Sequence, residues 1–179
     1  LTSMTNSFYN SVLETLVMGS ESVVFAQGGA GIAGMSAKNM TIRGGTIKVN
    51  AFSGRDNIET VILDGSVKWN SGGQFQGCTN LTSVSIGDGI TSIPNNCFGS
   101  CSSLNDVVLP DSITKIGQSS FSGCSSLTSI TLSKNIKKIP NSCFSNCGFE
   151  TFTISDDSLT EALENVIFSG CSKLKTVYI

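Results

Sequence analysis

Large apolar residues recur along this chain at a fixed interval. Six phenylalanines follow one another at intervals of 23 residues, except for the last interval, which is 24 residues. They are Phe52, Phe75, Phe98, Phe121, Phe144 and Phe168. Each Phe opens the same phrase, F-x-G-C-x-x-L-x-x-V-x-L, which is clearest from Phe75 to Ile86 and from Phe121 to Leu132. A period of this length is typical of repeat architectures.

Within each repeat, the V-x-L end of the phrase alternates apolar with polar residues, which predicts a short strand buried on one face. A further apolar pair follows, as at Ile90 and Ile93, and Pro94 then marks a turn. Because every repeat runs in the same direction, we expect successive strands to be parallel. One repeat cannot cover its own apolar face, so stacked repeats should bury a continuous core in a solenoid.

We expect residues 1–179 to form a single domain, with regular repeats over 46–179 and irregular, degenerate turns over 1–45. In the irregular part, Phe8 to Met18 matches Phe144 to Ile154, including a shared one-residue shortening, and Met40 to Ile42 predicts a further strand. The chain begins with Leu1 and ends on an apolar run, so we also expect it to be part of a longer protein.

The repeated phrase resembles the BspA-like leucine-rich repeats, found chiefly in surface proteins of host-associated bacteria and in some protists. The resemblance rests on five F-x-[GSN]-C phrases; Arg55 stands where the unit of Phe52 would carry its Cys. It implies a β-rich, right-handed solenoid with short parallel strands on one face and turns and short 3-10 or helical segments on the other. It also implies adhesion or partner recognition outside the cell or at its surface.

One helix is predicted in the last, irregular unit. Ser158 and Glu161 have capping-box spacing, and the apolar residues up to Ile167 can share one helical face. Asp156 and Asp157 precede this segment, where they suit a helix N-terminus; a calcium site is the alternative.

Seven cysteines raise the question of disulfides or metal. Five share one position of the repeat, and Cys97 and Cys143 share another, just before Phe; the five are Cys78, Cys101, Cys124, Cys147 and Cys171. We expect buried thiols that act as small hydrophobic groups, because their number is odd and their common orientation disfavours the disulfide torsion. The C-x-x-x-C spacing does not suit zinc, so we predict no metal-binding residue. We also predict no cofactor-binding and no catalytic residue.

A glycine motif favours a different class. Gly29 to Gly34 fits G-x-G-x-x-G after an apolar run, which is typical of dinucleotide-binding units. That function needs a helix and an acidic residue about 20 positions on, but Gly44 and Gly45 follow soon and the first acid is Asp56. We interpret the glycines as a tight turn, and keep a dinucleotide enzyme as a remote alternative.

Composition further narrows the classes of function that this chain can have. Charged residues make up 13% of the chain and the formal net charge is −2, whereas nucleic-acid binders usually carry a basic field; we predict no nucleic-acid partner. No apolar run is long enough to span a bilayer, so we expect no membrane insertion. Histidine is absent, which removes the commonest general base and zinc ligand.

Some polar and aromatic residues have two interpretations each. Trp69 is a contact anchor or packs over the junction at Gly72 and Gly73. Three short acidic motifs suit turns or, alternatively, supply paired carboxylates; they are Asp64-Gly65, Asp88-Gly89 and Asp111-Ser112.

The outward positions of the predicted strands form a hydroxyl-rich, nearly uncharged face. Solenoids commonly bind partners on such a face, although these residues are also ordinary strand formers. The predicted partner-binding residues are Thr60, Ile62, Ser83, Ser85, Asp106, Val108, Ser129, Thr131, Thr151, Thr153, Thr176 and Tyr178.

We therefore expect a non-enzymatic binding or adhesion module of a secreted or cell-surface bacterial protein, with a host or bacterial surface protein or a glycan as partner and without a cofactor. One alternative is a structural spacer that associates end to end through open strand edges. Ice or mineral binding is a weaker idea, because Asp106 and Ile62 break the hydroxyl ladder.

Overall fold

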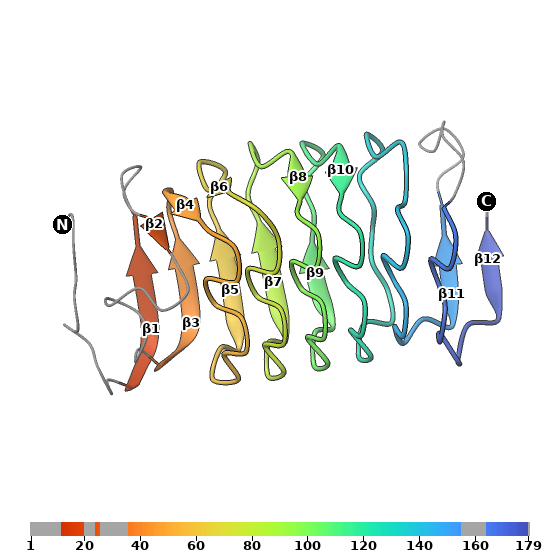
Figure 1. The fold of residues 1–179 in the computed structure, drawn as a ribbon, viewed down its shortest axis with the longest axis horizontal. Helices are drawn as coiled ribbons and strands as arrows, with labels where there is room; N and C mark the ends of the chain where they lie inside the picture. The colour runs from red at the N-terminus through yellow and green to blue at the C-terminus, as the bar shows by residue number, and fades with distance from the viewer. Residues whose placement is uncertain (1–11, 20–23, 26–35, 155–163, 179) are drawn as a thin grey trace.

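The computed structural model describes residues 12–19, 24–25, 36–154 and 164–178. They form a solenoid whose coils stack side by side along one long axis, with β1 (Val12–Met18) and β12 (Thr176–Tyr178) at opposite ends of the stack (Figure 1). Every strand pair is parallel. The predicted solenoid with parallel strands is therefore confirmed.

Most coils contribute a strand to a main sheet and a two-residue strand to a lateral sheet. The main sheet has the order β1 (Val12–Met18), β3 (Ser36–Ile42), β5 (Thr60–Leu63), β7 (Ser83–Ile86) and β9 (Asp106–Val108). A separate pair follows, β11 (Thr151–Thr153) and β12 (Thr176–Tyr178). The lateral strands are β2 (Val24–Phe25), β4 (Thr46–Ile47), β6 (Lys68–Trp69), β8 (Ser92–Ile93) and β10 (Lys115–Ile116).

The repeated phenylalanines form a column through the core. Neighbouring rings lie nearly parallel, with centroids 5.1 Å apart between Phe52 and Phe75 and 6.1 Å apart between Phe144 and Phe168. Phe75, Phe98 and Phe121 are completely buried. Each coil thus covers the apolar face of the next, which is what the 23-residue period requires.

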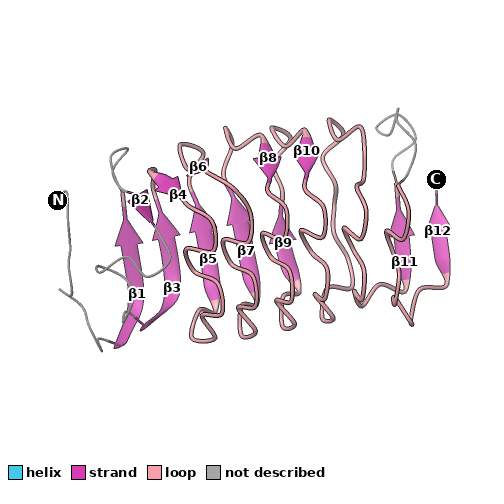
Figure 2. Ribbon diagram, viewed as in Figure 1, coloured by secondary structure: helices cyan, strands magenta, loops and turns pink. Residues whose placement is uncertain are grey.

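The side opposite the main sheet is built from turns, and no described residue is helical (Figure 2). The short 3-10 or helical segments implied by the family resemblance are wrong for the described part of the chain. Two positions in each coil, such as Asn96 and Ser100, have positive φ, which a helix does not allow. The N–H groups of Asn96, Phe98 and Ser100 donate to carbonyls of the next coil at 2.6 to 2.9 Å, so they are not available to a helix.

The main sheet is interrupted in one coil, and there the predicted strand around Ser129 and Thr131 is absent. No backbone hydrogen bond among the described residues joins 128–132 to β9 or β11, and Figure 2 shows no strand of the main sheet between β9 and β11. The expectation of one strand in every repeat is therefore wrong here.

Two local features flank the interruption. Asp64 and Gly87 donate their N–H groups to the preceding coil at 2.8 and 2.7 Å, but the equivalent residue of the next coil is Pro110, which has no N–H. On the other side, the unit that begins at Phe144 is one residue shorter before its strand. The missing N–H of Pro110 shortens the pairing of β9 with β7, and the shorter unit shifts the strand of β11 by one residue relative to the interrupted coil.

The predicted helix up to Ile167 lies mostly outside the described residues, as do Asp156 and Asp157. Its described end, from residue 164, is a turn with Val166 at φ 53°, so a helix does not extend to Ile167. The glycine motif at Gly29 to Gly34 also lies outside the described residues.

Candidate functional site

The strand register arranges the outward side chains of the main sheet in two rows. We call them the polar row, Thr15, Asn39, Thr60, Ser83 and Asp106, and the aliphatic row, Val17, Thr41, Ile62, Ser85 and Val108. In the second sheet, Thr151 pairs with Thr176 and Thr153 pairs with Tyr178. Ser129 and Thr131 lie in the interrupted coil, so the structure does not place them on a strand.

Side chains of the polar row form hydrogen bonds with one another or with the backbone of the neighbouring strand. The Thr60 hydroxyl donates to Asn39 Oδ1 at 2.7 Å, and Asn39 Nδ2 donates to the Glu14 carbonyl at 3.1 Å. The Ser83 hydroxyl donates to Asp106 Oδ2 at 3.2 Å. These side chains are held in place before any partner arrives.

The aliphatic row instead exposes methyl groups to solvent. Val17, Ile62 and Val108 are each about half exposed, at 54%, 50% and 55%. Sequence reasoning missed Val17 and Thr41, which complete the row on β1 and β3. The signal for Thr41 was the alternation of Asn39, Met40, Thr41 and Ile42, and the signal for Val17 was the match of Phe8 to Met18 with Phe144 to Ile154, which aligns it with Thr153.

An open hollow of about 560 Å³ adjoins this face at the C-terminal ends of the strands. It is lined by Ile62 and Ser85 of the aliphatic row and by Arg43, Asp64 and Asp88. Hydrogen bonds from the backbone and hydroxyl of Ser66, with a smaller contribution from the positive charge of Arg43, lower the pKa of Asp64. The hollow therefore adds fixed charges to one edge of the face, which we did not predict.

The acidic motifs lie in turns between coils that approach each other closely. A side chain at Gly65 would place its Cβ 1.4 Å from the carbonyl oxygen of Asp88. Only glycine fits this contact, so the motif around Asp64 and Gly65 has a structural role.

All seven cysteines are free and buried. Five of the thiols donate to the carbonyl of the Phe that opens the preceding coil, at 3.0 to 3.2 Å; they are Cys78, Cys101, Cys124, Cys147 and Cys171. Burial raises the pKa of Cys78 to about 11 and that of Cys143 to about 12. Since the thiolate is the reactive form, these residues are structural.

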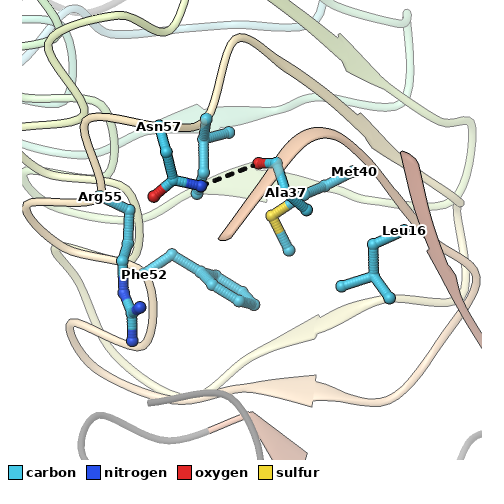
Figure 3. A pocket seen from close by; sticks show the side chains of 7 residues that line it. Leu16, Ala37, Met40, Phe52, Arg55 and Asn57 are labelled. Carbon is cyan, nitrogen blue, oxygen red and sulfur yellow. Dashed lines mark hydrogen bonds between the residues drawn. The ribbon is translucent and has the colours of Figure 1, made fainter. Parts of the chain in front are cut away.

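A small cavity lies where Arg55 replaces the repeated Cys (Figure 3). Its volume is about 10 Å³, and Phe52, Met40 and Leu16 lie around it. Asn57 Nδ2 donates to the Ala37 carbonyl at its rim, at 3.1 Å. A space of this size holds at most one water, so it is a packing defect at the start of the regular array.

Trp69 is partly buried and packs against the hydrophobic core. This burial favours packing over a role as an exposed contact anchor, while packing over Gly72 and Gly73 stays a prediction. Among the described residues its indole Nε1 is buried without a hydrogen-bond acceptor.

In the part of the chain that the structure describes, no group of three or more His, Cys, Asp or Glu side chains is arranged to hold a metal ion. The same residues contain no helix with the length and apolar character needed to cross a membrane.

Several solved structures share this fold. A leucine-rich repeat protein from Bacteroides ovatus is 28% identical with a TM-score of 0.71, and the match covers 82% of this chain and 38% of that one. One from Eubacterium ventriosum is 22% identical with a TM-score of 0.72, covering 88% and 42%. A leucine rich cell surface protein from Faecalibacterium prausnitzii is 21% identical with a TM-score of 0.56, covering 93% and 47%. The chain thus spans less than half the length of each.

The sequence itself also matches a described repeat family. No curated protein matches the chain. Residues 45–175, most of the chain, match the BspA type leucine rich repeat region in 6 copies. Together with the stacked Phe column and the parallel sheets, this match shows that the chain belongs to the BspA-type leucine-rich repeat family.

Proposed function

We propose that this solenoid is a non-enzymatic adhesion module of a secreted or cell-surface bacterial protein, and that it recognises a partner through the outward face of its main sheet. The aliphatic row carries this proposal. Exposed Val17, Ile62 and Val108 follow the same line across parallel strands. Membership of the BspA-type family and the cell-surface description of the Faecalibacterium prausnitzii protein support it.

The two rows have different roles in this proposal. The aliphatic row gains free energy when a partner covers it, because burial of apolar area contributes about 25 cal/mol per Å². The polar row loses little side-chain entropy on binding, since Asn39, Thr60, Ser83 and Asp106 already hold one another. Because the exposed side chains of Val17, Ile62 and Val108 cannot form hydrogen bonds, they favour a protein partner over a glycan.

The test is a pair of matched double variants. Ile62→Glu with Val108→Glu places two charges in the aliphatic row. Val49→Glu with Val166→Glu adds the same charges at exposed valines outside it. Wild type and variants are applied to an array of host extracellular-matrix proteins and to a glycan array, with far-UV circular dichroism as the check on folding.

We expect wild type and the Val49/Val166 variant to bind the same protein and the Ile62/Val108 variant to lose at least tenfold in affinity, a loss of about 1.4 kcal/mol. Equal binding by both variants would place the site elsewhere. If wild type binds nothing on either array, the adhesion proposal fails. Light scattering then tests the spacer alternative, which requires end-to-end association.

The dinucleotide alternative receives no support from the described residues, because its motif lies outside them. Calorimetry with nicotinamide and flavin dinucleotides tests it directly. Saturable micromolar binding would overturn the proposal of a non-enzymatic module.

A further inference from the structure

The interrupted coil also opens a groove on the lateral side of the solenoid, away from the outward face. Its volume is about 760 Å³, and residues of four successive coils line it. The side chains that matter to its chemistry are Lys115, Gln118, Asn135, Lys137, Lys138 and Glu164.

The groove lies next to β10, where the second of the two lateral sheets, β8 with β10, ends. Within each of the two lateral sheets the backbone bonds to the neighbouring coil: Lys68 donates its N–H to Gly45 and Thr114 donates to Thr91, both at 2.9 Å. The next residue in this series is Lys137, and no backbone bond joins it to Thr114 in the described part of the chain. At the groove, therefore, no backbone hydrogen bond joins the described residues 113–117 to 136–140, although the same two coils are bonded on their turn side, as by Ser119 to Asn141 at 3.2 Å.

Positive charge dominates the groove. Lys138 Nζ lies 2.6 Å from Glu164 Oε1, and Glu164 Oε2 accepts a hydrogen bond from the Asn141 N–H at 2.7 Å. This pair is mutually neutralised. Lys115 and Lys137 are exposed, and neither forms an ion pair with another described residue.

Two unpaired ammonium groups therefore face one groove in a chain whose formal net charge is −2. Lys134 of the same coil shows the contrast, since its Nζ lies 3.5 Å from Asp111 Oδ2. The positive potential is thus local to the groove and does not come from a basic chain.

We propose that this groove binds an acidic oligosaccharide, with Lys115 and Lys137 holding its carboxylate or sulfate groups. Gln118 and Asn135 offer amide groups, which both donate to and accept from sugar hydroxyls. The volume lies within the range of small-ligand sites.

An acidic peptide fits the groove less well. Its apolar lining is limited to Ile116, which is only 6% exposed, Pro140 and the lysine stems, so no deep pocket receives an apolar side chain. The lateral strands are two residues long, too short to hold a peptide as an added strand.

Calorimetry on the full chain tests the proposal with defined probes. A sulfated heparin hexasaccharide and an oligomer of α2,8-linked sialic acid distinguish sulfate from carboxylate. Maltohexaose is the neutral sugar, and hexaglutamate is the acidic peptide. Lys115→Gln with Lys137→Gln removes the two charges, and Lys48→Gln with Lys173→Gln is the control, because it removes the same charge from exposed lysines elsewhere.

We expect at least one acidic sugar to bind, with affinity that falls as salt rises, and a loss of about tenfold or more in the Lys115/Lys137 variant alone. Equal loss in the Lys48/Lys173 variant would show a general charge effect and overturn the proposal. So would binding of maltohexaose or hexaglutamate as tight as that of the acidic sugars, or no binding of either acidic sugar at millimolar concentration. The Ile62/Val108 variant should bind the sugars normally, which separates this site from the outward face.

Discussion

Alkaline pH should unfold this protein, because its buried thiols stay protonated in the folded state. An unfolded Cys titrates near pH 9.0, whereas burial raises the pKa of Cys78 to about 11 and that of Cys143 to about 12. Burial also raises the pKa of the other five cysteines. Above pH 9 the folded chain therefore binds more protons than the unfolded chain, and its stability falls as pH rises.

The size of the effect follows from linkage. Each thiol that is protonated only in the folded state lowers the free energy of unfolding by about 1.4 kcal/mol per pH unit. Cys171 is the least buried of the seven cysteines. The other six together give a slope of about 8 kcal/mol per pH unit. Domain stabilities are about 5–15 kcal/mol, so the transition should fall within roughly one to two pH units above pH 9.

Urea denaturation followed by far-UV circular dichroism measures this slope between pH 8 and pH 10.5 under reducing conditions. The matched variant carries Cys97→Ser and Cys143→Ser, because Ser120 already occupies the same buried position in the coil between them. Its slope should be shallower by roughly 3 kcal/mol per pH unit. A stability that is flat from pH 9 to pH 10.5, or an equal slope in the variant, would refute the reasoning.

Three further outcomes are expected. Val166 is a β-branched residue at φ 53° and 60% exposed, so Val166→Asn should stabilise the folded protein by about 1 kcal/mol. Val49→Asn is the control, because Val49 is exposed but has no positive φ, and it should not stabilise the protein. An equal gain in both variants would contradict this prediction. Gly65→Ala forces a backbone shift against Asp88 and should lower the free energy of unfolding by about 3 kcal/mol or more. Gly54→Ala has open space around it and should lower it by about 1 kcal/mol. Equal losses for the two variants in urea denaturation would count against the close contact between coils. Ellman's reagent should label the folded chain at pH 8 far more slowly than the urea-unfolded chain, and rapid labelling of all seven thiols would show that they are accessible.

Much of the fold could be predicted because stacking turns a position in the repeat into a position in space. Phe52, Phe75 and Phe98 share one position in sequence, and their rings form one column. The same reasoning predicted the buried thiols, because five of the cysteines share one position in the repeat. The family match from residue 45 to 175 agrees with this array.

The predictions failed where neighbouring repeats differ. Pro110 was visible in the sequence, but only the stacked coils show that an N–H at this position bonds to the preceding coil, as it does at Asp64 and Gly87. The helix up to Ile167 was predicted from the local spacing of its residues. In the described turn the backbone instead forms hydrogen bonds between coils: the Val166 carbonyl accepts from the Ser145 hydroxyl at 3.0 Å.

The sequence by itself determined the period, the residues that face the core and the direction of the strands, because these depend on a pattern that every repeat shares. Only the tertiary structure decided that the polar row binds to itself while the aliphatic row is exposed. It also decided that one coil leaves both sheets and opens a groove beside Lys115 and Lys137. Both depend on the register between coils, which is set by hydrogen bonds across the stack and is not encoded within any single repeat.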